Sequence, residues 1–317
     1  MSKITTQRII SFILSFIMIP GLFSAVSLTV AAADSAIPAN AIHIKTAAEL
    51  EKIGSEQSAG KYYVLDNDIN LTAEWVPIYG FAGMFDGQGH SINNLFILAS
   101  SAQPHAGLFG TIIKDYVTIK NVGVNIGEQG VNAYDSSAGG LACAGGVVGS
   151  NGGKITNCYT TGNVTSYHSS DLTFYYNFPG SDYSDGSIII AYDCAGGLVG
   201  RNGGTIINCY AMGNVTAHDS AGGLVGDTTN TTINNCYRLK TQTVTGSKIN
   251  ESGTPLSESD MRLQSSFTGW DFTTVWAIDL SINGGYPHLR SGEEKNSATQ
   301  VWDSIFSIIR EILQGKK

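Results

Sequence analysis

The amino-acid sequence predicts an all-β protein: a right-handed parallel β-helix with a short N-terminal capping helix and a C-terminal amphipathic helix. The main observation is a repeat, because the segment 144–165 recurs nearly unchanged at 195–216 and a third copy begins at Ala221. A second observation is the composition, which has 38 glycines in 317 residues and many Asn and Thr residues. Such a composition is typical of short strands joined by tight turns.

Each repeat contains a Gly-apolar-apolar-(Gly or Asp) element followed by Ile-x-Asn, and two fainter copies begin at Ala82 and Ala106. Without its variable loops, the unit is roughly 26 residues long and offers three short strand-like runs. Three short strands cannot bury an apolar face by themselves, but stacked repeats can, with equivalent strands ~4.8 Å apart in parallel sheets. Crossovers between parallel strands favour a right hand, which predicts the handedness of the helix.

Three positions of the Ile-x-Asn element are expected to stack from repeat to repeat. The isoleucine and the residue after the asparagine are predicted to face inward, so the chain must bend between them. Asparagine suits the bend because it tolerates a left-handed backbone and can bond its amide to the next asparagine of the stack. The predicted columns are Ile92, Ile119, Ile155, Ile206 and Ile233; Leu95, Val122, Cys158, Cys209 and Cys236; and the structural ladder Asn94, Asn121, Asn157, Asn208 and Asn235.

The organisation predicted along the chain is a signal peptide at 1–33, a β-helix domain at 42–290 with an insertion loop at 166–192, a linker at 291–299 and an amphipathic helix at 300–317. Lys3 and Arg8 precede an apolar run that leads to three alanines, Ala31 to Ala33, which is the layout of a cleaved secretory signal. An uncleaved membrane anchor is the alternative. The C-terminal helix has one apolar face, which either docks on the protein's own strands or attaches to a partner or membrane surface.

Both ends of a β-helix need a cover, because an open sheet edge would pair with other strands. Thr46 and Glu49, three residues apart, predict a capping box at the start of a short helix over the first repeat. The segment 270–289, which contains Trp270, Trp276 and Tyr286, is expected to close the other end.

The combination of Gly-Leu-Val-Gly with Asn-Cys-Tyr and Gly-Asn-Val resembles the GLUG-motif family of bacterial secreted and surface proteins. The resemblance covers about residues 42 to 290, and the flanking segments YYVLDNDINL and WDFTTVWAIDLSINGGYPHL look like those of the same family. Similar repeats occur beside the catalytic region of bacterial immunoglobulin-A-cleaving metalloproteases. The resemblance implies a surface location and little defined chemistry.

The charge of the chain restricts the class of partner. The full sequence carries a formal net charge of −8, and without Lys3 and Arg8 the exported chain would carry −10. A basic footprint is missing, which argues against nucleic acid and anionic lipid as partners. We therefore expect an extracellular or cell-surface protein whose membrane contact, if any, is made by the C-terminal helix.

The cysteines and two aspartates are expected to meet in the stack. Cys143 and Cys194 both precede Ala-Gly-Gly, so they share a column in which a disulfide could form, whereas the three cysteines of the inward column act as small apolar residues. Asp193 and Asp219 also share a register and should lie ~5 Å apart, with Asp135 as an additional member. The pair could bind Ca²⁺ or resemble a retaining-glycosidase pair, or it could be a solvated turn. Asp66, Asn67 and Asp68 are a second set of oxygen ligands, although Asx turns are commoner in such a context.

The insertion is the expected binding surface, because long loops on a rigid scaffold tend to carry function. Its aromatic side chains suit stacking on sugar rings or contact with a protein, unless they only cover a flank of the helix. The candidate binding residues are Tyr167, Phe174, Tyr175, Tyr176, Tyr183 and Tyr192, which lie together with Phe178.

No catalytic motif is present in the sequence: no H-E-x-x-H, no G-x-S-x-G, no P-loop and no dinucleotide fingerprint. No catalytic residue and no cofactor other than Ca²⁺ are therefore predicted. The favoured function is a non-catalytic module for adhesion to a glycan or surface protein. The alternatives are a β-helix polysaccharide lyase or glycoside hydrolase, which the sparse and scattered Lys and Arg residues disfavour, and a structural spacer in a larger surface assembly.

Overall fold

The computed structural model describes residues 37–55, 57–98, 104–136, 140–168, 174–176, 187–189 and 192–292. The chain divides into two compact units, Met1–Ala39 and Asn40–Lys317, and the strands lie in the second. The signal peptide expected at 1–33, most of the linker expected at 291–299 and the amphipathic helix expected at 300–317 lie outside the described residues. Within the described part of the chain, the helices are too short to cross a membrane.

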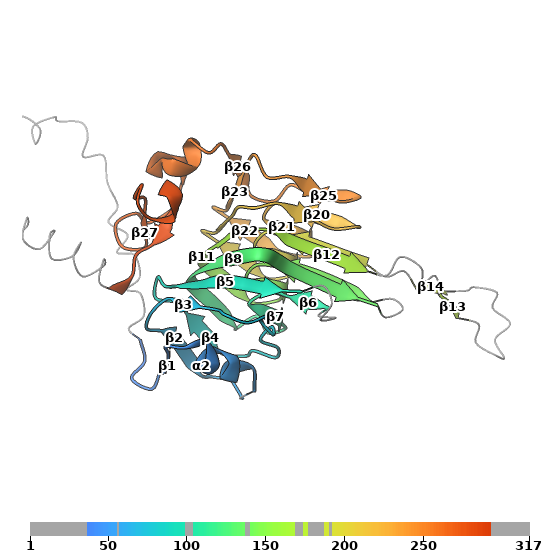
Figure 1. Cartoon of the computed structure of the whole chain (residues 1–317), viewed down its shortest axis with the longest axis horizontal. Coiled ribbons are helices and arrows are strands. Elements are labelled where there is room, and N and C mark those ends of the chain that lie inside the picture. Colours follow the sequence, from blue (N-terminus) through green and yellow to red (C-terminus); the bar gives the residue numbers. More distant parts are fainter. Residues whose placement is uncertain are drawn as a thin grey trace, which may run out of the picture. The chain divides into compact units, whose positions relative to one another are not determined.

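The described part is mostly β, and its main sheets are parallel (Figure 1). The first sheet contains β1 (Ile42–Ile44), β2 (Tyr62–Leu65), β3 (Ile69–Asn70), β4 (Met84–Asp86), β5 (Ser91–Ile97), β8 (Thr118–Asp135), β11 (Lys154–Thr161), β12 (Val164–His168), β17 (Thr205–Ile207), β18 (Tyr210–Ala211), β19 (Val215–Thr216), β22 (Thr232–Asn234), β23 (Tyr237–Leu239), β24 (Val244–Thr245) and β26 (Thr254–Leu256). The second contains β7 (Phe109–Ile112), β10 (Val148–Asn151), β16 (Val199–Asn202) and β21 (Val225–Thr228). The third contains β6 (His105–Ala106), β9 (Leu141–Gly145), β15 (Tyr192–Gly196), β20 (Ser220–Gly222) and β25 (Lys248–Asn250).

Two antiparallel pairs and a few helical turns complete the described structure. The pairs are β13 (Phe174–Tyr176) with β14 (Ser187–Ile189), and β27 (Trp276–Ala277) with β28 (His288–Leu289). The helical elements are α2 (Ala47–Lys52) and the 3₁₀ turns η1 (Ile53–Ser55), η3 (Asp260–Arg262), η4 (Gln264–Ser266) and η5 (Asn283–Gly285).

Every full repeat visits the three sheets in the same order. The chain runs from β15 in the third sheet to β16 in the second and β17 in the first, and then repeats this path through β20, β21 and β22. The register confirms the predicted isoleucine column, because Ile155 pairs with Ile119 on one side and Ile206 on the other, and Ile206 pairs with Ile233. The first three of these side chains are buried in the main core, and Ile233 packs against it.

Four of the predicted asparagines form a ladder of side-chain amides. The amide nitrogen of Asn157 donates to Asn121 at 3.0 Å, that of Asn208 donates to Asn157 at 3.3 Å, and that of Asn235 donates to Asn208 at 3.3 Å. All four have a positive φ between 50° and 53°, the left-handed conformation that the predicted bend requires. Asn121 in turn donates to the buried carboxylate of Asp86 at 3.0 Å, so a carboxylate ends the ladder.

The first repeat is in a different register from the one expected, and Ile92 and Leu95 do not join the predicted columns. Ile92 pairs with Val124, and Leu95 pairs with Ile126, both beyond the Ile-x-Asn element of β8. Both side chains are fully buried, so they still face the core. Ser-Ile-Asn-Asn at 91–94 has the pattern of the repeat element but lies on β5, one strand after the strand β4 that takes that place.

The position next to Ile119 is occupied by Phe85 of β4. Asn94 therefore does not stand under Asn121, and the prediction that it is a rung of the ladder is wrong. Its φ of 59° is still left-handed, but its amide donates to the backbone carbonyl of Leu71 at 2.8 Å. The physical reason is that Phe85 of β4 fills the inward position beside Ile119, while β5 pairs with a later part of β8.

The cysteines occupy two columns, as the repeats predict. Cys143 of β9 pairs in register with Cys194 of β15, and the two form a disulfide with a Cα–Cα distance of 4.7 Å. Cys158, Cys209 and Cys236 are reduced and buried in the main core. The disulfide thus ties two successive repeats together, while the other column packs as apolar side chains.

The segment after β26 packs along the repeats and does not close their end as expected. The tyrosine after each core cysteine points away from the core, because side chains alternate along a strand. Tyr159, Tyr210 and Tyr237 thus form a second cluster, into which Trp270 and Trp276 pack. The ring centroid of Trp276 lies 6.0 Å from the ring centroid of Tyr210 and 4.1 Å from that of the Trp270 ring. One C-terminal segment therefore covers three successive repeats.

The predicted N-terminal capping box is present. The backbone N–H of Glu49 donates to the Thr46 hydroxyl, while the Glu49 carboxylate accepts from the backbone of Thr46 at 3.1 Å. The helix α2 buries Leu50 completely in the main core. This buried leucine attaches the short helix to the core.

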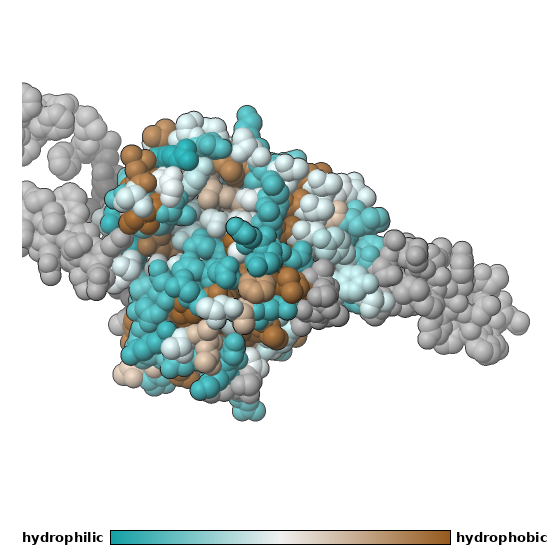
Figure 2. Space-filling view, in the orientation of Figure 1, coloured by the Kyte–Doolittle hydropathy of each residue, from teal (hydrophilic) through white to brown (hydrophobic). Residues whose placement is uncertain are grey.

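The described surface carries isolated apolar side chains. On the face shown in Figure 2, hydrophobic residues occur in small groups between hydrophilic ones. The most exposed large apolar residues lie in three separate segments, represented by Leu280, by Val76, and by Ile113 with Tyr116. Scattered apolar residues of this kind are normal for a protein surface.

Candidate functional site

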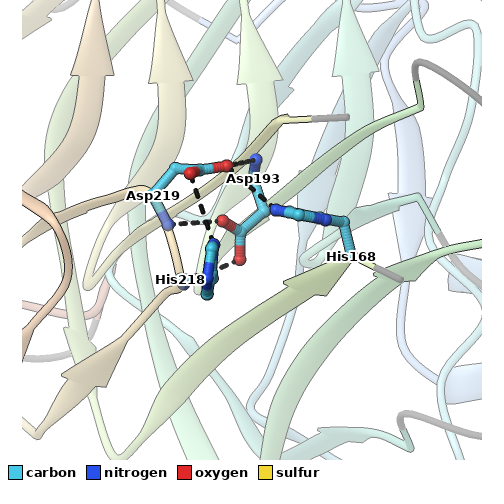
Figure 3. A group of neighbouring side chains, drawn as sticks. All are labelled: His168, Asp193, His218 and Asp219. Atoms are coloured by element: carbon cyan, nitrogen blue, oxygen red, sulfur yellow. Dashed lines mark hydrogen bonds and ion pairs between the residues drawn. The ribbon is translucent and has the colours of Figure 1, made fainter. Parts of the chain in front are cut away.

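The strongest cluster of chemically active side chains lies where the insertion joins the third sheet. β12 ends at His168, in the first residues of the insertion, and β15 brings Asp193 just after it. The short connection between β19 and β20 supplies His218 and Asp219. Because Cys194 of β15 pairs with Ser220 of β20, the two aspartates before them become neighbours. Figure 3 shows the resulting group of two carboxylates and two imidazoles.

The two aspartates hold each other in place through the backbone. The N–H of Asp219 donates to Asp193 Oδ1 at 2.7 Å, and the N–H of Asp193 donates to Asp219 Oδ2 at 3.0 Å. Asp193 Oδ2 accepts a further bond from the N–H of His218 at 3.0 Å. The predicted proximity of Asp193 and Asp219 is confirmed, and their reciprocal bonds fix both side-chain directions.

Two histidines approach Asp219, one from the strand β12 and one from the connection between β19 and β20. His168 Nε2 lies 3.1 Å from Asp219 Oδ2, and His218 Nδ1 lies 3.3 Å from Asp219 Oδ1. The two imidazole rings meet edge to face, with centroids 4.9 Å apart. The side chain of His168 is 8% exposed and that of His218 is 63% exposed, so the group reaches from the interior to solvent.

The electrostatics of the group are dominated by the burial of Asp193, which is 0% exposed. Burial raises the pKa of Asp193, the adjacent Asp219 carboxylate adds to the rise, and the N–H groups of His218 and Asp219 oppose it. Among the described residues, neither carboxylate has a lysine or arginine within ion-pair distance. The negative charge of the pair is therefore met by backbone N–H groups and by imidazole.

The sequence predicted the aspartate pair but not the histidines. His168 lies at the start of the long insertion, and its position next to Asp219 depends on how the strands on both sides of the insertion pair. The signal for His218 was the dipeptide His218-Asp219 directly before Ser-Ala-Gly-Gly. Asp135, the expected additional carboxylate, instead stands opposite His168 in the register of β8 and β12.

The aromatic residues proposed for binding are only partly described. Tyr167 of β12 is 42% exposed and Tyr192 of β15 is half-buried. Phe174, Tyr175 and Tyr176 form β13, whose backbone pairs with β14, so the insertion contains an antiparallel strand pair that the sequence did not predict. Tyr183 and Phe178 lie outside the described residues.

The second predicted set of oxygen ligands is engaged in other contacts. Asp66 lies 2.6 Å from His43 Nδ1 and 3.5 Å from Lys45 Nζ. Asp68 accepts a bond from the N–H of Ser91 at 2.8 Å, while the Asn67 amide donates to backbone carbonyls. These contacts already engage all three residues, which together with His90 and Ser91 line one surface pocket.

Comparison with known proteins confirms the resemblance found in the repeats. Residues 191–216 match the family model described as "The GLUG motif". A curated protein of Evansella cellulosilytica, named "Putative Gly-rich membrane protein", is 31% identical over 102 residues, which cover 29% of this chain and 11% of that protein. The matched part is thus a small share of the relative's length. A crystal structure from Bacteroides ovatus, described as "a putative immunoglobulin A1 protease", is similar at 18% identity and a TM-score of 0.43, over 79% of this chain and 92% of that one.

Proposed function

With the GLUG motif at 191–216 as the premise, we propose that this chain is a non-catalytic module, secreted or held at the cell surface, that binds a glycan or a surface protein through its insertion. The scaffold of the proposal is a right-handed parallel β-helix. Support comes from the constant order in which each repeat visits the three parallel sheets, and from the right-handed preference of parallel crossovers.

The observation that carries the proposal is that the insertion leaves the register of the scaffold unchanged. Before it, Thr165 pairs with Thr216, and after it, Cys194 pairs with Ser220. The next repeat joins the same two positions with the short connection Ala217–Asp219. The insertion is therefore an addition that the stacking of strands does not require, and such additions to rigid scaffolds tend to carry binding function.

The chemistry of the insertion favours a saccharide or protein surface. Its sequence places aromatic residues among Asp and Ser residues, and the one whose side chain is described as exposed, Tyr167, stands at its root. Aromatic rings with polar neighbours stack on sugar rings and on partner side chains. Because the chain is acidic, a neutral or basic ligand is favoured over a polyanion.

A surface location is supported by two independent features. The leader-like sequence at 1–33 has the basic start, apolar middle and small-residue end of an export signal. In addition, the relative from Evansella cellulosilytica carries the word membrane in its name. Detection of the mature N-terminus near residue 34 in the culture medium or on the cell surface would support this location. Retention of an intact leader inside the cell would contradict it.

The binding proposal is tested by shortening the insertion while keeping its roots. Residues 170–190 are replaced by a short Gly-Ser linker, which keeps His168 and Asp193 and leaves the disulfide intact. A glycan array and a panel of surface proteins, each with and without Ca²⁺, first identify the ligand of the parent chain. The shortened variant should keep its far-UV circular dichroism and melting temperature but lose binding.

A matched control distinguishes aromatic contact from general surface change. Tyr175→Ala with Tyr176→Ala removes two rings of the insertion, and Tyr116→Ala removes an exposed ring from a turn far from it in sequence; the Tyr116 side chain is 59% exposed. The double variant should bind at least ~10-fold more weakly, and Tyr116→Ala should bind as the parent does. If the shortened variant binds normally, the insertion is not the binding surface. Release of unsaturated sugar from any polysaccharide would instead indicate a lyase.

A further inference from the structure

We propose that His168, Asp193, His218 and Asp219 form a binding site for one divalent transition-metal ion of the zinc class. The site lies at the base of the insertion and is independent of the binding function proposed above. Each of the four residues offers one ligand atom, and these atoms all lie within 4.8 Å of one another. Two imidazole nitrogens and two carboxylate oxygens make a complete four-coordinate donor set.

The spacing of the donors fits a small ion. Zinc binds histidine nitrogen and carboxylate oxygen at about 2.0–2.2 Å, so two donor atoms of a tetrahedral site lie about 3.3–3.6 Å apart. His168 Nε2 lies 3.1 Å from Asp219 Oδ2, whereas His218 Nδ1 lies 3.3 Å from the other oxygen, Oδ1, so an ion held by one Asp219 oxygen requires one of these side chains to shift. Small side-chain adjustments are therefore enough to surround an ion, because the strands already bring the donors together.

The state of His168 points to a missing ligand. Its side chain is more than nine-tenths buried, and neither ring nitrogen makes a hydrogen bond. Nε2 is close to Asp219, but their mutual direction is not that of a hydrogen bond. Figure 3 shows the ring directed toward the two carboxylates. A buried polar group without a partner is costly, and an ion between the imidazole and the carboxylates would remove that cost.

Charge balance leads to the same conclusion. Asp193 is fully buried beside Asp219, and within the described part of the chain no lysine or arginine neutralises either carboxylate. Two adjacent carboxylates repel each other, and a divalent cation cancels both charges at once. The backbone bonds to Asp193 from His218 and Asp219 hold the carboxylate in place, which is the outer support that metal ligands usually have.

The donor types select the class of ion. Ca²⁺ and Mg²⁺ prefer six or more oxygen ligands, and imidazole is a poor donor for both. Imidazole with carboxylate suits Zn²⁺ and its neighbours in the first transition row. The two histidines therefore favour a zinc-class ion over Ca²⁺, which was one of the alternatives that the sequence left open for the aspartate pair.

The site would connect both roots of the insertion to the next repeat. His168 ends the strand β12 at the start of the insertion, and Asp193 is the second residue of the strand β15 at its end. His218 and Asp219 belong to the following repeat. A bound ion would thus restrain the base of the insertion, and the exposed His218 gives the ion a path from solvent. Four protein ligands leave no open position, which is the pattern of a structural site.

The test measures metal binding to the untagged full chain, exported and oxidised, after removal of metals with a chelator. Zn²⁺, Co²⁺, Mn²⁺, Ca²⁺ and Mg²⁺ are titrated separately by calorimetry, with thermal unfolding as a second readout. We expect one Zn²⁺ per chain, a higher melting temperature with Zn²⁺, and no comparable effect of Ca²⁺ or Mg²⁺. Co²⁺ should give the intense visible absorption of four-coordinate geometry.

Two ligand variants and one matched control complete the test. His168→Ala removes the buried ligand, and His218→Ala removes an exposed ligand whose loss should not impair folding. Each should weaken Zn²⁺ binding by roughly 100-fold or more, since even outer-sphere partners change affinity by about 10–100-fold. His43→Ala removes the histidine of another His-Asp pair, with Asp66, and should leave affinity unchanged. Absence of stoichiometric Zn²⁺, equal affinity for Ca²⁺, or unchanged affinity in His218→Ala would overturn the assignment.

Discussion

Replacing Asn157 in the middle of the asparagine ladder separates two contributions of this residue to stability. Its amide donates to Asn121 at 3.0 Å and its carbonyl accepts from Asn208 at 3.3 Å, so Asn157→Gly removes two hydrogen bonds but keeps the left-handed backbone accessible. At about 1 kcal/mol for each bond, we expect Asn157→Gly to lower the free energy of unfolding by about 2 kcal/mol, before any added flexibility.

Asn157→Ala adds a second cost, because alanine must adopt the φ of 52° that asparagine holds there. The left-handed conformation costs a residue with a Cβ about 1–2 kcal/mol, so Asn157→Ala should lose about 3–4 kcal/mol. Asn230 provides the control, since it has a φ of 49° in an exposed turn outside the ladder. There, the difference between the Ala and Gly variants should match the difference at position 157.

Equilibrium unfolding in urea, followed by tryptophan fluorescence, measures these differences if the slope with denaturant stays constant. The C-terminal tryptophans report on the stack because they pack on its tyrosines. The reasoning is refuted if Asn157→Gly is as stable as the parent. In that case the ladder would be a by-product of the bend, and the backbone conformation alone would explain why asparagine recurs.

Three further predictions concern the disulfide, the tyrosine cluster and a glycine turn. Replacing both Cys143 and Cys194 by alanine should cost about 4 kcal/mol, because their bond spans a sequence separation of 51, and urea unfolding with and without reductant measures the loss. Burial raises the pKa of Tyr159 to about 12 from 10.0, so the folded state keeps its proton as the pH rises above 10. Stability should therefore fall between pH 10 and pH 12 by up to about 3 kcal/mol, which unfolding at fixed pH values measures, and Tyr159→Phe should remove this part of the fall. Gly213→Ala should lower the free energy of unfolding by more than ~2 kcal/mol, because φ is 104° and the new Cβ would lie 2.1 Å from the carbonyl oxygen of Gly162. A thermal melt measures this loss, and an unchanged melting temperature would contradict the close approach of the two turns.

The later repeats could be predicted from the sequence because the same Ile-x-Asn-Cys element recurs in each of them. Ile155, Ile206 and Ile233 pair in register although the connections between them differ in length, because the extra residues lie in a loop outside the paired strands. The disulfide column followed from the same argument. The first repeat failed because two stretches, at 84–86 and 91–97, compete for the same place, and only packing decides that Phe85 takes it.

The features that the sequence could not predict depend on contacts between distant segments. The local sequence around Trp270 does not predict that its indole N–H donates to the backbone carbonyl of Asn235, because this contact joins segments 35 residues apart. His168 was missed for a similar reason, since it meets Asp219 only after the strands on both sides of the insertion have paired. Local periodicity thus predicts the stacked strands, whereas the C-terminal cover and the cluster of two histidines and two aspartates form only when the strands assemble.

The asparagine ladder has a direction, which makes the two ends of the array unequal for evolution by duplication. Every amide points its N–H toward the N-terminal neighbour, and the series stops at Asp86, a carboxylate that has no N–H to pass on. The asparagine of a copied unit placed after Asn235 could donate its amide N–H to the side-chain carbonyl oxygen of Asn235, as each earlier asparagine does to its neighbour. The asparagine of a copy placed before Asp86 would have a side-chain carbonyl oxygen with no N–H to accept, because the Asp86 carboxylate has none. Lengthening of this protein should therefore be tolerated at its C-terminal side and resisted at its N-terminal side.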